Sequence, residues 1–179
     1  RQSAIFRGGF DYAAAQAVLG ATLPLLTRLV DKSLLQWQAT VGEGRYALHE
    51  LLRQFAAEQL AQVAPEQEAV AARHRAFYLT YLAVRERRLT RAEPRAAAAI
   101  QVELDNVRQA WQNAAQRRDF AALHQSAWAF FSFYRHIGSL AEALKAFQTV
   151  ADQIPLPAQP DLACGPQQPQ EPLAPHSRL

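Results

Sequence analysis

The chain has 179 residues, half of them hydrophobic, which is enough to bury the core of one domain or of two small ones. Its formal net charge of +3 at pH 7 does not by itself indicate nucleic-acid binding, and its single cysteine, Cys164, excludes an intrachain disulfide and a cysteine-based zinc cluster. No apolar run approaches the roughly 20 residues of a membrane span, so we expect a cytoplasmic chain without a membrane partner. Because the sequence contains no methionine, we interpret it as a fragment of a longer protein.

Alanine and leucine, rather than β-branched residues, supply most of the apolar side chains, which predicts a mainly α fold. Asp11 is a good N-cap and Gly20 a good terminator, so a short first helix is expected between them. A second helix should run from Thr22 to about Lys32. Its apolar residues recur at helical spacing and are expected to form a buried face: Leu23, Leu26, Leu29 and Val30.

From Leu34 the apolar period changes from helical to alternating, which is the pattern of a half-buried strand. Glycines at 42 and 44 supply a turn, and residues 45–48 predict the returning strand. Two short helices followed by a small β-hairpin are the order of a winged-helix unit that lacks its first helix. We therefore predict a partial winged-helix domain over residues 1–63, with Gly42 to Gly44 as its wing.

The rest of the chain up to residue 154 is predicted to be helical. Helical periodicity, prolines and turn residues predict helices at about 49–63, 66–89, 95–117, 119–137 and 139–154. The short connections between them predict antiparallel neighbours. Ser139, with Glu142 three residues later, predicts a capping box at the start of the last helix.

The last two helices follow much of the tetratricopeptide repeat pattern, in which a small residue marks close helix packing. The matching residues are Tyr134, Gly138, Leu140, Ala143, Phe147 and Pro155. Ala127 and Phe131 depart from the pattern, and an ordinary helical hairpin is the alternative. Residues 64–154 are predicted to form a helical linker and a tetratricopeptide-like region. The proline-rich residues 155–179 are predicted to form a disordered tail.

His49 is the candidate site residue, because it lies where the hairpin meets the next helix. Unpaired backbone N–H groups point outward at a helix start and attract anions, so a histidine there could hydrogen-bond a phosphate. From residue chemistry alone, a capping or surface histidine is the alternative. The other histidines lack the spacing of a metal site or a catalytic triad and are expected on helix surfaces: His74, His124, His136 and His176.

Several segments resemble one family. IFRGGFDYAAAQAVLG, LVDKSLLQ and RYALHELLRQFAAEQL are similar to the winged-helix segment of the signal-transducing NTPases with numerous domains, the NB-ARC-type regulators, and most of all to bacterial members. VELDNVRQAWQNA and FSFYRHIGSLAEALKAF resemble the linker helices and the first repeat of those proteins. In that family a Met-His-Asp motif follows the hairpin, and its histidine touches the β-phosphate of bound ADP in the resting state. Leu48-His49-Glu50 matches that motif at the histidine and departs from it on either side.

The resemblance implies that the intact protein binds ADP or ATP in an upstream nucleotide-binding domain, and that His49 contacts the phosphate there. It also implies a protein partner on the helical repeats. The chain has no G-x-x-x-x-G-K-S/T phosphate loop, so we expect no cofactor, metal or catalytic activity in this fragment itself.

DNA is an unlikely partner on the sequence, since the helix at 22–32 offers only Arg28 and Lys32, opposed by Asp31. In the basic stretch over residues 73–95, helical spacing places the aromatics in the core and the arginines on the solvated face. The predicted function is a regulatory and scaffolding segment whose winged helix closes on an ADP-bound domain. The alternative is a winged-helix DNA-binding transcriptional regulator.

Overall fold

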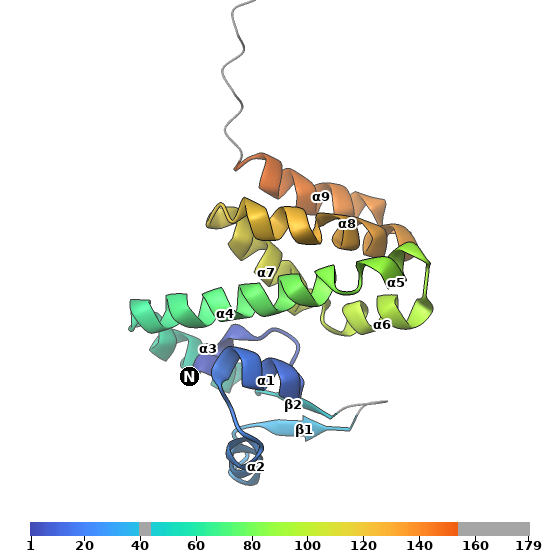
Figure 1. Ribbon diagram of the computed structural model, residues 1–179. Coiled ribbons are helices and arrows are strands. Elements are labelled where there is room, and N and C mark those ends of the chain that lie inside the picture. Colours follow the sequence, from blue (N-terminus) through green and yellow to red (C-terminus); the bar gives the residue numbers. More distant parts are fainter. Residues whose placement is uncertain (40–43, 154–179) are drawn as a thin grey trace, which may run out of the picture.

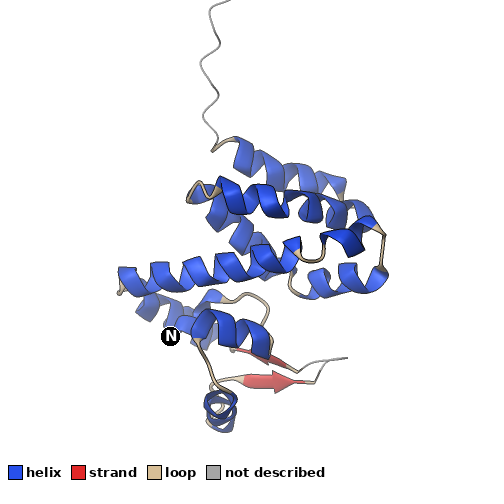
Figure 2. Cartoon of the chain, viewed as in Figure 1, coloured by secondary structure: helices blue, strands red, loops and turns tan. Residues whose placement is uncertain are grey.

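The computed structural model describes residues 1–39 and 44–153, and this part is mainly helical with one small antiparallel sheet (Figure 2). The predicted mainly α fold with a β-hairpin is therefore confirmed. Most of the predicted wing, all of the predicted disordered tail and Pro155 of the repeat pattern lie outside the described residues. The domain boundary placed at residue 63 stays a prediction.

The N-terminal elements form a small unit at one end of the molecule (Figure 1). They are the 3-10 helix η1 (Gln2–Ile5), α1 (Tyr12–Leu19), α2 (Leu23–Asp31), β1 (Gln36–Gln38), β2 (Arg45–Ala47) and α3 (Glu50–Ala61). The long helix α4 (Ala64–Ala83) crosses the middle of the molecule, and three helices lie on its other side (Figure 1): α7 (Leu104–Gln116), α8 (Phe120–His136) and α9 (Leu140–Ala151). The helices α5 (Glu86–Thr90) and α6 (Pro94–Val102) follow the C-terminal end of α4.

The caps of α1 are those predicted. The Asp11 carboxylate accepts a hydrogen bond from the Ala14 N–H at 2.7 Å, and Gly20 ends the helix in the left-handed region with a φ of 64°.

The helix α2 has the predicted bounds, but the prediction of its buried face is wrong in part. Leu26 is buried, whereas Leu23 is 53% exposed. The reason is the position of α2, which lies at the lower end of the molecule, apart from the long helices (Figure 1).

The hairpin is joined to the segment before α1 as well as within itself. β1 and β2 pair antiparallel with Trp37 opposite Tyr46, and Phe10 exchanges two backbone hydrogen bonds with Tyr46, at 2.8 and 2.9 Å. Gly9 has a φ of 90°, and a Cβ there would lie 2.8 Å from the Tyr46 carbonyl oxygen, so this close approach requires glycine. Residues 9 and 10 are thereby fixed against β2.

Two helices that were predicted as continuous are each divided. The helix expected over residues 66–89 breaks after Ala83, because the Arg85 guanidinium donates to the Tyr81 carbonyl at 2.8 Å and lies over the Tyr81 ring at 3.3 Å. The Arg85 N–H bonds to the Leu82 carbonyl instead. The helix expected over residues 95–117 breaks at Glu103, whose carboxylate turns into the interior.

The predicted capping box at Ser139 is wrong. The Ser139 side chain makes no capping hydrogen bond, and the Glu142 carboxylate pairs with Arg108 of α7 instead. Ala143 of α9 is nevertheless buried, and its small side chain allows α9 to pack closely. Trp111 fills the space between α7, α8 and α9, with ring centroids 4.9 Å from Phe130 and 5.1 Å from Phe147. The assignment of this hairpin to the tetratricopeptide pattern stays a prediction.

A buried polar cluster joins the N-terminal unit to the helices beyond it; we call it the Glu103 joint, and it comprises Glu103, Arg45, Tyr78 and Asn106. The Glu103 carboxylate pairs with Arg45 of β2 and accepts hydrogen bonds from the Tyr78 hydroxyl at 3.1 Å and the Asn106 amide at 3.0 Å. Burial and the nearby carboxylate raise the pKa of Tyr78 well above its ordinary value, so its hydroxyl remains a donor.

Asn106 extends the joint to the loop between η1 and α1. Its side-chain oxygen accepts from the Arg7 backbone N–H at 2.7 Å, and its amide nitrogen donates to the Gly9 carbonyl at 2.9 Å. The joint therefore connects residues 7–9, β2, α4 and the start of α7.

Among the described residues, no single helix is both long and apolar enough to cross a membrane. Within those residues, only the bent pair of α1 and α2, taken together, has the length and composition of a span.

Replacing Glu103 with Gln should lower the free energy of unfolding by about 3 kcal/mol, because it leaves the buried Arg45 guanidinium without its counter-charge. Urea denaturation measures this change. The matched control is Glu68→Gln, whose side chain is 42% exposed and pairs with the 54% exposed Arg117. It should cost less than about 1 kcal/mol. Equal losses in the two variants would contradict a structural role for the joint.

Candidate functional site

His49 is the N-cap of α3, so it lies at a helix start as the sequence predicted. The side chain is exposed, and its Nδ1 accepts a long hydrogen bond of 3.4 Å from the Leu51 N–H. A neutral histidine that accepts at Nδ1 carries its proton on Nε2, which is then available to a ligand. The alternative of a capping surface histidine is thus confirmed as its state in this structure. A phosphate contact stays a prediction.

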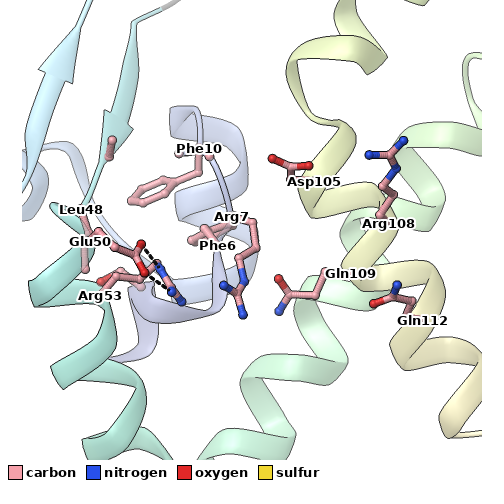
Figure 3. A pocket seen from close by; sticks show the side chains of 14 residues that line it. Phe6, Arg7, Phe10, Leu48, Glu50, Arg53, Asp105, Arg108, Gln109 and Gln112 are labelled. Atoms are coloured by element: carbon pink, nitrogen blue, oxygen red, sulfur yellow. Dashed lines mark hydrogen bonds and ion pairs between the residues drawn. The ribbon is translucent and has the colours of Figure 1, made fainter.

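The carboxylate beside His49 is held by its own helix. Glu50 accepts two hydrogen bonds from the Arg53 guanidinium, at 2.6 and 2.8 Å (Figure 3). It accepts a third from the Gln54 amide at 3.0 Å. The hydrogen bond from Arg53 is the main cause that lowers the pKa of Glu50 to about 2. The first turn of α3 therefore carries a permanent negative charge, paired within the helix.

The surface beside His49 is apolar rather than basic. Leu51 is 69% exposed and Phe55 is 60% exposed, and they are one helical turn apart on α3. Helical spacing puts them near the other apolar residues of this segment: Leu52, Ala56, Leu60 and Val63. Leu51 and Phe55 are nevertheless exposed, because α3 packs on η1 and α4 with its other side.

The helix in the position of a recognition helix is also more apolar than basic. On α2, Leu23 and Leu25 are 53% and 46% exposed, whereas the only cations in or next to it are Arg28 and Lys32. Trp37 of β1 is 54% exposed as well. Phosphate contacts of a DNA-binding protein are made largely by lysine and arginine. This surface offers few such groups.

The histidine predictions hold for His124 and His136, which are exposed, and fail for His74, which is 2% exposed. His176 lies outside the described residues. The His74 ring lies against Phe6 and Tyr78, with centroid distances of 5.6 and 4.7 Å, and its Nε2 is 3.5 Å from the Asn106 side-chain oxygen. Val70, His74 and Tyr78 are spaced four apart, which is the signal that places this histidine on the buried stripe.

The arginines of the basic stretch are only partly on the solvated face. Arg75 pairs with Asp119 at 3.2 Å, and Arg73 donates to the Val18 carbonyl at 2.6 Å, so both hold other elements against α4. The aromatics of the stretch are buried or half-buried as predicted: Phe77, Tyr78 and Tyr81. Among the residues described, no group of three or more His, Cys, Asp or Glu side chains is placed to hold a metal ion.

Comparison with known proteins finds similarity to a short part of three mycobacterial proteins. No protein-family model and no solved structure matches it. Over 118 residues, or 62% of the chain, it is 36% identical to proteins of Mycobacterium tuberculosis strains CDC 1551 and H37Rv and of Mycobacterium bovis. All three are named as HTH-type transcriptional regulators, and the match spans only 13% of the length of each. The chain is therefore similar to a short part of bacterial regulators.

The free energy of unfolding should fall as the pH drops from about 6.5 to about 4, because His74 is buried in its neutral form. Burial lowers the pKa of His74 to about 4, so between these pH values the unfolded chain binds a proton at this residue that the folded chain excludes. The loss from this residue should be roughly 3 kcal/mol in total.

Urea denaturation across this pH range, in wild type and His74→Gln, measures the effect. The variant should lose this part of the pH dependence, whereas the matched control His124→Gln, at an exposed position, should retain it. An unchanged pH dependence in His74→Gln would contradict the exclusion of a proton from this site.

Proposed function

We propose that this chain is a regulatory, protein-contacting segment of a bacterial transcriptional regulator, and not its DNA-reading part. The observation that carries the proposal is the exposure of large apolar side chains on two helices of the winged-helix unit, Leu23 and Leu25 on α2 and Leu51 and Phe55 on α3. Neighbouring exposed apolar side chains are typical of protein interfaces, whereas a DNA-reading helix needs cations for phosphates. The similarity to named regulators supports the transcriptional role.

The finer proposal concerns the partner of this surface. Following the resemblance to NB-ARC-type signal-transducing NTPases, the unit closes on an upstream nucleotide-binding domain that holds ADP. His49 then donates a hydrogen bond to the phosphate from Nε2, while the adjacent Leu51 and Phe55 are covered by the same domain. This combination is supported by geometry, since the histidine and both apolar side chains start from the first two turns of α3.

The switch in this proposal depends on unequal affinity of the nucleotide for two states. A ligand shifts a conformational equilibrium only by the difference in its binding free energy between those states. A hydrogen bond from His49 that forms only in the closed state would supply part of that difference. The helical hairpin of α8 and α9 would receive a protein partner.

A second candidate is direct DNA binding by the winged-helix unit. The observation in its favour is that the three relatives are named as HTH-type regulators. Under this reading α2 would lie in the major groove and its cations would contact phosphates. Titration with DNA distinguishes the two candidate functions.

The chain should show no sequence-specific DNA binding at physiological salt. Titration with promoter and random duplexes should give weak binding that does not discriminate between them, because α2 supplies too few cations. The double variant Arg28→Ala, Lys32→Ala should then change nothing. Submicromolar, sequence-discriminating affinity that this double variant removes would establish the second candidate instead.

In the intact protein, replacing His49 with Ala should weaken ADP retention by about ten- to a hundredfold. This is the loss of one hydrogen bond to a charged group, about 1.5 to 3 kcal/mol. ATP affinity should change less, since the open state moves the winged helix away from the nucleotide. Nucleotide off-rates measure both effects, with the exposed His124→Ala as control. Equal ADP off-rates in a folded His49 variant would leave this histidine as a helix cap only.

A further inference from the structure

A cavity lies between the winged-helix unit and α7, and the functions discussed so far leave it unused (Figure 3). Its volume is about 590 Å³, which is in the range of small-molecule sites. Residues 6–10 form one wall, the end of β2 with the first turn of α3 forms a second, and α7 forms the third. The cavity is therefore built where the Glu103 joint holds the two parts of the molecule together.

Charged side chains from all three walls line the cavity, and some of them are already paired. These side chains are Arg7, Glu50, Arg53, Asp105 and Arg108. Glu50 and Arg53 neutralise each other, and Arg108 pairs with Glu142. Arg7 and Asp105 form no side-chain hydrogen bond or ion pair with any other residue in the described ranges. The charge of Arg7 acts on Glu50 and that of Asp105 on Arg108, but neither side chain has a hydrogen-bonding partner in those ranges, so both can bind a ligand.

Both free charges are carried by backbone that the joint fixes. The Arg7 N–H donates to Asn106 at 2.7 Å, and Asp105 precedes Asn106 in the first turn of α7. Figure 3 shows Arg7 entering the cavity from the loop and Asp105 from α7, with Gln109 on the same side of α7. A ligand would meet a preformed pair of opposite charges, which reduces the ordering cost of binding.

Gln109 lines the same wall as Asp105 and brings an amide side chain, a group that can both donate and accept. On the wall formed by the end of β2 and the start of α3, Ala47 and Leu48 add apolar side chains beside Glu50 and Arg53 (Figure 3).

We propose that this cavity binds a small zwitterion, an amino acid with an aliphatic side chain. The planar Arg7 guanidinium takes the carboxylate in a two-bond contact. Asp105 takes the ammonium group, which has three donors and no acceptor. The aliphatic side chain lies against Leu48. A simple anion would leave Asp105 without a group of the ligand to bind, and a simple amine would leave Arg7 without one, so a zwitterion uses the pair of charges more fully than either.

Calorimetric titration of the 179-residue chain tests the proposal with three probes that share the isobutyl group of leucine. L-Leucine carries both charges, 4-methylpentanoate carries only the carboxylate, and isoamylamine carries only the ammonium group. Leucine should bind at least about tenfold more tightly than either, since each lost charge removes hydrogen bonds to a charged group. The measurement needs neither DNA nor nucleotide and is independent of the proposed regulatory role.

Variants of the two charged residues test whether leucine binds in this cavity. Arg7→Gln and Asp105→Asn should each weaken leucine binding at least about tenfold, because each removes one of the two charges. The matched controls, Arg95→Gln on α6 and Asp31→Asn on α2, are exposed and should bind as wild type does. If Arg7→Gln loses its helical circular dichroism, Arg7→Lys replaces it, since lysine keeps the charge and loses the two-bond geometry.

Several outcomes would overturn the proposal. Equal affinity for leucine and 4-methylpentanoate, with no effect of Asp105→Asn, would make the cavity an anion site. Leucine binding that survives both cavity variants would place the ligand elsewhere. Absence of binding by leucine, isoleucine and valine up to about 10 mM would show that the cavity does not select this class of ligand.

Discussion

The structure depends on the burial of one carboxylate, that of Glu103. A charge removed from water is tolerated only where opposite charge and hydrogen-bond donors surround it. Arg45, Tyr78 and Asn106 meet this requirement from three separate parts of the chain. Because each donor has a fixed direction, one arrangement of these parts satisfies the carboxylate, and others leave a buried charge unpaired.

That constraint shapes the surrounding backbone. The helix expected over residues 95–117 is broken so that Glu103 can point inward and Asn106 can reach the loop at residues 7–9. The loop in turn lies against β2 through Gly9, and β2 leads directly into His49 and α3. The position of the candidate phosphate contact and the walls of the proposed ligand cavity thus follow from the same buried contacts. A change in the Glu103 joint would therefore displace both His49 and the walls of the cavity.

The sequence predicted those features that depend on neighbouring residues. Asp11 and Gly20 define α1 through contacts within a few residues, and the apolar period of the hairpin gives its two strands. It did not predict the breaks at Arg85 and Glu103. The break at Glu103 follows contacts with a residue 58 positions away, which no local pattern contains. Exposure of Leu23, Leu51 and Phe55 was missed for a related reason, since periodicity marks an apolar face without saying what covers it.

For the candidate site, the sequence correctly placed His49 at a helix start, whereas the phosphate ligand was inferred only from the family resemblance. The Val70, His74 and Tyr78 spacing was a readable signal for a buried histidine, whereas Arg7 and Asp105, nearly 100 residues apart, are brought to one cavity only by the folded chain. Two charged residues so far apart in the chain form no local sequence pattern that would predict their proximity.

The Glu103 joint should make the winged-helix unit and the helices beyond it one cooperative body, which native-state hydrogen exchange can measure. We expect the most protected amides of α1 to exchange with the same free energy as those of α7 and α8, through global unfolding. If α1 amides exchange with a free energy several kcal/mol lower, while α7 and α8 remain protected, the unit opens on its own and the joint does not couple the two parts.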